Sequence, residues 1–101
     1  PTASHALVVP DAFAGAASAA LGRAGLEHGR AAASGLDQQI TVVPVGVVKG
    51  LELDGVVVVE PARIVADEPH GLRSLYVALT RATQRLTVIH ADPLPASMRQ
   101  P

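Results

Sequence analysis

Arg81 stands between two apolar segments, where a full positive charge needs an explanation. The run Leu75–Leu79 precedes it, and the run Arg85–His90 follows shortly after it. Arginine is always charged and presents a planar fork of donors that fits phosphate oxygens. A cation in the last turn of a helix also interacts favourably with the helix dipole, by a few tenths to about 1 kcal/mol. The sequence therefore leaves two roles for Arg81, a phosphate ligand or a helix-end cation.

A second group of polar residues is crowded into the stretch Val48–Val59. It consists of Lys49, Gly50, Glu52 and Asp54. The stretch follows a predicted strand, and parallel α/β sheets bind ligands outside the carboxyl ends of their strands. Its position therefore makes it a candidate ligand site. The alternative is a solvated turn whose geometry depends on its glycines.

Short apolar runs predict the strands that must position these residues. They are His5–Val9, Leu26–Ala31, Ile40–Val43, Val56–Val59 and Arg85–His90, the second of them a short edge strand. Four consecutive valines without alternation favour a strand that is covered on both faces. Helix-like segments separate the strands. This alternation predicts an α/β fold with a mostly parallel sheet flanked by helices.

Apolar residues at helical spacing predict two helices. The first spans Ala12–Ala24, with Asp11 as its N-cap and Gly25 at its end. The second begins near Asp67–Pro69 and carries one apolar stripe. Of that stripe we expect three side chains to face the core, those of Leu75, Tyr76 and Leu79. The domain then covers residues 1–92, and a proline-containing, irregular tail covers 93–101.

Composition excludes several classes of function. The 101 residues suit one domain, and a net charge of -1 means that any nucleic-acid contact must be local. There is no cysteine for a disulfide or thiolate metal site, and the four histidines lack metal-ligand spacing. There is no signal peptide and no apolar run of the ~20 residues that cross a bilayer. We expect no metal site and no membrane partner. Because the chain begins at Pro1 without a methionine, we interpret it as part of a longer protein.

The two polar stretches together resemble a known family. Lys49–Asp54, which reads KGLELD and precedes an apolar strand, resembles motif V of the UvrD/Rep-like superfamily-one helicases, usually KGLEFD. Leu75–Ala82, LYVALTRA, resembles their motif VI. The motifs occur in the family's order, and the resemblance is close over Ile40–His90. It implies a RecA-like fold, with this chain as the C-terminal part of the second motor domain of an ATP-dependent DNA helicase or translocase.

The resemblance also implies roles for individual residues. Arg81 would be catalytic, reaching the γ-phosphate and stabilising charge in the transition state. Glu52 would accept hydrogen bonds from the ribose hydroxyls of ATP, with Gly50 also at the nucleotide. Lys49 and Thr80 would contact nucleic acid; the alternatives are a solvated lysine and a threonine bonded to backbone.

The same resemblance implies a cofactor and partners. ATP with Mg²⁺ would be bound mainly by the first RecA-like domain of the same parent chain. That domain and DNA would be the partners of this chain, and the protein would be cytoplasmic.

Three departures from the family's pattern bear on this interpretation. The turn Val9–Ala12 has no arginine, where the family often has a second one for phosphate. Val43–Gly46 stands where the family usually has Thr-x-His. Only a short connection separates Leu26 from Ile40, where UvrD and Rep carry a large insertion. The short form resembles HelD-type ATPases, which act on RNA polymerase.

Two alternatives therefore stay open beside the DNA helicase. One is a HelD-type ATPase that remodels or recycles RNA polymerase, and the other is a non-catalytic α/β interaction domain. The chain contains no G-x-x-x-x-G-K-[ST] phosphate loop. We therefore expect ATP hydrolysis by the parent protein and none by the isolated chain.

Overall fold

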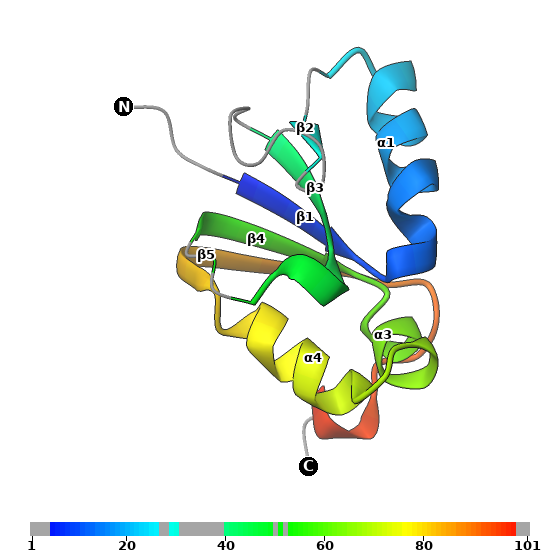
Figure 1. The fold of residues 1–101 in the computed structure, drawn as a ribbon, viewed down its shortest axis with the longest axis vertical. Helices are drawn as coiled ribbons and strands as arrows, with labels where there is room; N and C mark the ends of the chain where they lie inside the picture. The colour runs from blue at the N-terminus through cyan, green and yellow to red at the C-terminus, as the bar shows by residue number, and fades with distance from the viewer. Residues whose placement is uncertain (1–4, 27–28, 31–39, 50, 52, 99–101) are drawn as a thin grey trace.

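A parallel β-sheet with helices on both faces forms the body of the molecule (Figure 1). The computed structural model describes residues 5–26, 29–30, 40–49, 51 and 53–98. Within these ranges the strands are β1 (His5–Val9), β2 (Gly29–Arg30), β3 (Ile40–Pro44), β4 (Leu53–Val59) and β5 (Ala82–Ile89). They lie in the order β2-β3-β1-β4-β5, and every pairing is parallel. This confirms the α/β fold class.

The central strand β1 explains how the two faces are filled. Successive side chains of a strand point to opposite faces. Val8 therefore packs with Val58 under α3 (Pro61–Asp67) and α4 (Gly71–Leu79), whereas Val9 packs with Val42 under α1 (Ala14–Arg23). All four of these valines are fully buried. The continuous apolar runs thus build one core on each side of the sheet.

Helices cover the faces of the sheet less completely toward its β5 edge. Val56 and Val58 are buried beneath α3 and α4, but Val57 and Val59 on the opposite face are only half-buried. The reason is that α1 packs against β3 rather than β4. The predicted two-sided burial of the four valines is therefore complete on one face and partial on the other. On β5 itself, most side chains are exposed.

One predicted helix is two helices in the structure. The prediction began a helix near Asp67–Pro69, but α3 already spans Pro61–Asp67 and α4 begins at Gly71. Pro61 suits the first helical position because its fixed φ is helical and its missing N–H would have no partner there. Gly71 allows the two helices to approach. A Cβ there would lie 2.4 Å from the carbonyl oxygen of Ile64.

The inward stripe of α4 is also displaced from the prediction. Gly71, Leu75 and Ala78 are buried, at the i, i+4 and i+7 spacing of a single helical face. Tyr76 is 68% exposed and Leu72 57% exposed, so the prediction that Tyr76 faces the core is wrong. Both side chains lie off the face formed by Gly71, Leu75 and Ala78, which is the face that meets the core.

The ends of α1 were predicted in part. Gly25 adopts a positive φ of 76°, and the N–H of Leu26 donates to the carbonyl of Leu21 at 3.0 Å, so the helix ends as predicted. Asp11 does not act as the N-cap. It begins a 3₁₀ turn, Asp11–Phe13, and its carboxylate accepts a hydrogen bond from another loop. In the tail, Ala96–Met98 forms one 3₁₀ turn.

Candidate functional site

The two family-like stretches meet at the amino-terminal edge of β4 and β5. The backbone N–H of Leu53, the residue after Glu52, donates to the carbonyl oxygen of Arg81 at 3.1 Å. The hydroxyl of Thr83 then donates to the carbonyl of Leu53 at 3.1 Å. Leu53 also pairs in register with Ala82. The connection that follows β3 therefore begins at the carboxyl edge of the sheet and ends at its amino edge, beside Arg81.

The guanidinium of Arg81 makes one side-chain hydrogen bond to the residues that the structure describes, and its Nε makes none. Its Nη2 donates to the hydroxyl of Thr80 at 3.2 Å, and its buried Nε has no acceptor. In the part of the chain that the structure describes, no carboxylate pairs with it. The arrangement suits an external anion.

The Thr80 hydroxyl helps to hold the guanidinium of Arg81 in place. Its hydroxyl donates to the carbonyl of Val77 at 3.0 Å while it accepts from Arg81. The backbone N–H of Arg81 in turn donates to the carbonyl of Ala78 at 3.2 Å. The sequence left two roles for Thr80, a nucleic-acid contact or a hydrogen bond to the backbone. In the structure its hydroxyl makes the backbone bond. The predicted nucleotide ligands Gly50 and Glu52 lie outside the described residues.

Lys49 lies in a small notch that sequence inspection did not reveal. The notch, about 140 Å³ in volume, lies between the 3₁₀ turn Val45–Val47 and helix α4. Its lining residues are Val45, Gly46, Val48, Lys49, Arg73, Ser74 and Val77. Arg73 is 24 positions from Lys49, so no local motif links the two cations.

Carboxylates gather instead at the carboxyl edge of β1 and β3. The N–H of Gly46 donates to Oδ1 of Asp11 at 3.0 Å, and the N–H of Asp11 donates to Oε2 of Glu68 at 2.9 Å. Burial raises the pKa of Glu68; the hydrogen bond from the Asp11 N–H opposes this rise, and the negative charges of Asp11 and Asp67 add to it. These bonds join three loops. Asp11 lies at the turn where the family often has an arginine. Its carboxylate therefore holds the loop that contains Gly46.

Residues 39–89 match the family model of the UvrD-like helicase C-terminal domain. The match covers half of the chain and includes both family-like stretches. This chain belongs to the UvrD-like helicase C-terminal domain family. No curated protein matches it.

A solved structure shares the fold of this UvrD-like domain. It is the C-terminal domain of a possible DNA helicase from Lactobacillus plantarum WCFS1, with a TM-score of 0.78 and 24% sequence identity. The similarity covers 93% of this chain and 60% of that one. The UvrD-like domain therefore spans less than two thirds of the solved domain that it resembles.

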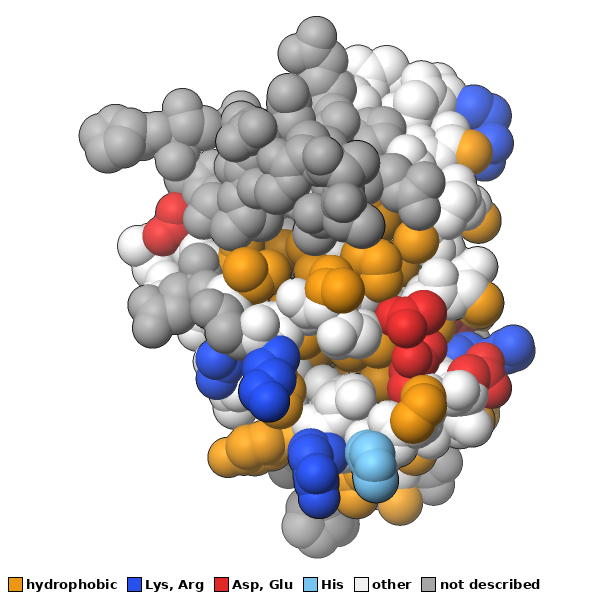
Figure 2. All heavy atoms as spheres, in the orientation of Figure 1, with side chains coloured by type: hydrophobic (Ala, Val, Ile, Leu, Met, Phe, Trp, Pro, Cys, Tyr) orange, Lys and Arg blue, Asp and Glu red, His pale blue; other side chains and the backbone are white. Residues whose placement is uncertain are grey.

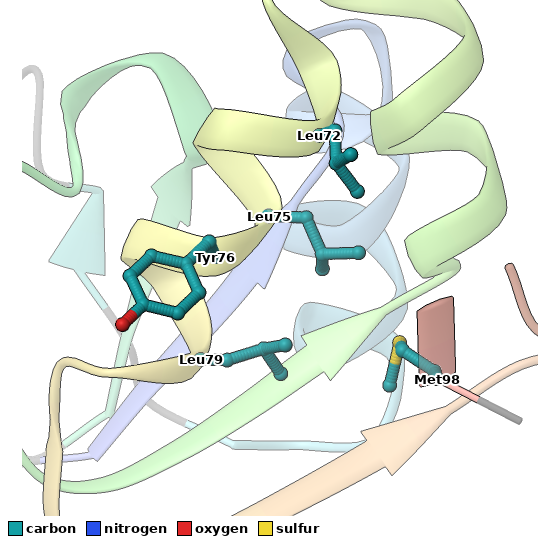
Figure 3. Close-up of a pocket in the computed structure, with 5 residues that line it drawn as sticks. All are labelled: Leu72, Leu75, Tyr76, Leu79 and Met98. Carbon is teal, nitrogen blue, oxygen red and sulfur yellow. The ribbon is translucent and has the colours of Figure 1, made fainter. Parts of the chain in front are cut away.

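An apolar groove on the UvrD-like domain lies beside α4, away from the charged residues. It has a volume of about 290 Å³ and is lined by Leu72, Leu75, Tyr76, Leu79 and Met98. In Figure 3, Leu75 and Leu79 point from α4 toward the side on which Met98 lies, whereas the Tyr76 ring points away from Met98. The groove offers no charged group for a phosphate.

Among the residues that the structure describes, no cluster of three or more histidine, cysteine or acidic side chains could hold a metal ion. None of the helices in the described ranges is long and apolar enough to span a membrane.

Proposed function

We propose that this UvrD-like domain is the second RecA-like domain of an ATP-dependent DNA helicase or translocase. It would complete the ATP site against the first RecA-like domain of the parent protein and couple hydrolysis to movement along DNA. The hydrogen bond between Leu53 and Arg81 carries the proposal. It joins the two family-like stretches at one edge of the sheet, where the buried Nε of Arg81 has no partner among the described residues.

In this role Arg81 acts on charge that develops in the transition state. Its planar donors would grip the γ-phosphate from the side opposite the first domain, and such arginines accelerate nucleoside triphosphate hydrolysis by roughly 10³ to 10⁵. The Thr80 hydroxyl restricts the guanidinium, so less entropy is lost when it binds phosphate. Glu52, one residue before Leu53, would accept hydrogen bonds from the ribose hydroxyls.

Mg²⁺ would be held by the first domain together with the phosphates. This assignment follows from the donors present, because the described residues offer no carboxylate cluster for the ion. DNA as the partner is supported by family membership and by the description of the solved neighbour as part of a possible DNA helicase. A cytoplasmic location accords with that role.

The experiment compares ATP hydrolysis by the full-length protein with and without single-stranded DNA. We expect turnover that rises when an oligonucleotide is added, and none from the isolated chain of 101 residues. Stimulation by RNA polymerase rather than DNA would favour the polymerase-remodelling alternative. A full-length protein that binds no ATP would favour the non-catalytic interaction domain.

A further inference from the structure

We propose that Thr83 is a positioning residue for ATP hydrolysis, because its hydroxyl fixes the backbone from which Arg81 projects. The inference rests on the proposed function and adds to it a residue that lies outside both family-like stretches. Thr83 follows the stretch Leu75–Ala82 directly. Its side chain reaches back to β4, where the hydroxyl donates to the carbonyl of Leu53 at 3.1 Å.

The backbone of Arg81 is held between a helix and the sheet. Two residues, Thr80 and Arg81, separate the end of α4 from the start of β5. On the helix side, the Arg81 N–H donates to the carbonyl of Ala78 at 3.2 Å, and Ala78 is fully buried. On the sheet side, the Arg81 carbonyl accepts from the N–H of Leu53 at 3.1 Å, and Leu53 is buried as well. The position of Arg81 therefore depends on how firmly β5 is joined to β4 at Leu53.

The pairing of β4 with β5 is irregular at this junction. The register shifts between two pairs of residues, Leu53 with Ala82 and Gly55 with Arg85. Between these pairs β4 advances by two residues and β5 by three. Thr83 and Gln84 of β5 thus face a single residue of β4, which is the arrangement of a β-bulge. Because a bulge interrupts the regular ladder, the backbone hydrogen bonds hold this junction less firmly than they hold the rest of the strand pair.

The Thr83 hydroxyl supplies a bond across this irregular junction. The bond is partly buried, so water competes with it less than with the exposed bond between Arg81 and Thr80. The Leu53 backbone therefore bonds through its N–H to Arg81 and through its carbonyl to Thr83. The two threonines act on different parts of the arginine, because Thr80 holds the guanidinium and Thr83 holds the backbone.

Charge alone does not explain why the position of Arg81 must be fixed. Figure 2 shows Lys and Arg side chains gathered over α4, and Asp and Glu side chains gathered where α1 and α3 approach each other. A phosphate group on this face is therefore attracted to the α4 side. The rate depends further on donors that already stand where charge develops in the transition state, and a displacement of about 1 Å can cost about 10²-fold. A hydroxyl that holds the Arg81 backbone thus acts on the rate and leaves the attraction for ATP unchanged.

The test replaces Thr83 with valine in the full-length protein. Valine has the shape of threonine and also favours strands, but it cannot donate the hydrogen bond. We expect kcat for ATP hydrolysis to fall by roughly 10- to 100-fold, since the displaced arginine meets the transition state less well. The Kd for ATP, measured with a fluorescent analogue, should stay unchanged. Thr83→Ser keeps the hydroxyl and should retain most of kcat.

Thr87→Val is the matched control. Thr87 lies on the same strand, is exposed and pairs with Val57, so the same substitution there should leave kcat unchanged. A double-mutant cycle adds a measurement that a general loss of stability would not change. Once Arg81→Lys has removed the planar donors, Thr83→Val should lower kcat no further. Thermal melts check that each variant stays folded at the assay temperature.

The possible failures of the two proposals are distinguishable. Normal kcat in Thr83→Val would overturn the inference and leave the proposed function standing. So would an equal loss of kcat with and without Arg81→Lys, because Thr83 would then act independently of Arg81. A raised Kd for ATP with normal kcat would also overturn it, since the hydroxyl would then serve nucleotide binding. A full-length protein that does not hydrolyse ATP, or that keeps its turnover in Arg81→Lys, would overturn the role proposed for Arg81 and this inference with it.

Discussion

The two edges of the sheet use their charged groups differently. At the carboxyl edge, Asp11 and Glu68 both accept hydrogen bonds from backbone N–H groups, and these bonds join loops of the same chain. At the amino edge, Arg81 holds a buried Nε without a partner. Folded proteins satisfy nearly all buried polar groups, because leaving one unpaired costs about 1–3 kcal/mol. Among the described residues, the carboxyl edge thus bonds its carboxylates within the chain, whereas Arg81 Nε at the amino edge is, with Thr41 Oγ1, a buried side-chain atom that has no partner.

Arg81→Lys should have the largest effect and leave the fold intact. Lysine keeps the positive charge near the end of α4, but it lacks the planar fork that grips a phosphoryl group. We expect most of kcat in the full-length protein to be lost, toward the roughly 10³ to 10⁵ that such arginines contribute. Steady-state ATP hydrolysis and thermal melts measure the two consequences separately.

The control for this variant is Arg85→Lys. Arg85 lies on β5 and is exposed, so the same substitution should leave turnover unchanged. Near-normal turnover in Arg81→Lys would return Arg81 to the role of a helix-end cation. The two edges would then no longer differ in function.

Glu52→Ala tests the same edge through nucleotide binding. The ribose contact exists in the ground state and the transition state alike, so its loss raises KM and the nucleotide Kd more than it lowers kcat. A hydrogen bond to a charged group contributes about 1.5–3 kcal/mol. We expect ATP affinity to fall by roughly one to two orders of magnitude, measured by titration of a fluorescent ATP analogue. Unchanged affinity in a folded variant would contradict the ribose assignment.

Asp11→Ala should lower the stability of the loops at the carboxyl edge and leave the rate of ATP hydrolysis unchanged. It removes the acceptor of the Gly46 N–H, and we expect the free energy of unfolding to fall by about 1 kcal/mol, since the bond is exposed. Turnover per folded molecule should stay unchanged. Asp11→Asn is the matched control, because the amide oxygen still accepts this bond. Lost turnover in a folded Asp11→Ala protein would show that the carboxyl edge also serves the chemistry.

Sequence patterns predicted the sheet well and its surroundings less well. Continuous valine runs identify β3 and β4 because buried parallel strands need apolar residues on both faces. The helix α3 was missed because the prediction placed no helix between the strand Val56–Val59 and Asp67, although Pro61 suits the first position of a helix. The outward position of Tyr76 was missed because an apolar stripe does not reveal which of its members meets the core.

The candidate site shows the same division. Arg81 was identified through its local motif, and the structure adds the bond from the Leu53 N–H to its carbonyl and a buried Nε that has no partner among the described residues. The notch was missed because Lys49 and Arg73 belong to separate segments, and only the packing of α4 beside the turn after β3 brings them together. The roles of Glu52 and Gly50 stay predictions.

Glu68→Gln should have the smallest effect and tests the carboxyl edge through pH. Burial raises the pKa of Glu68 above its ordinary 4.5; the hydrogen bond from the Asp11 N–H offsets part of this, and the charges of Asp11 and Asp67 add to the rise. The folded state therefore holds this proton more tightly than the unfolded state, and the resulting stabilisation is lost as pH rises through the raised pKa. Glutamine stays neutral and its oxygen still accepts from the Asp11 N–H. As pH rises from 4, the melting temperature of the variant should accordingly increase relative to that of the original protein. The difference between the two should become constant near neutrality. A difference that does not vary with pH would mean that the fold imposes no cost on the Glu68 charge.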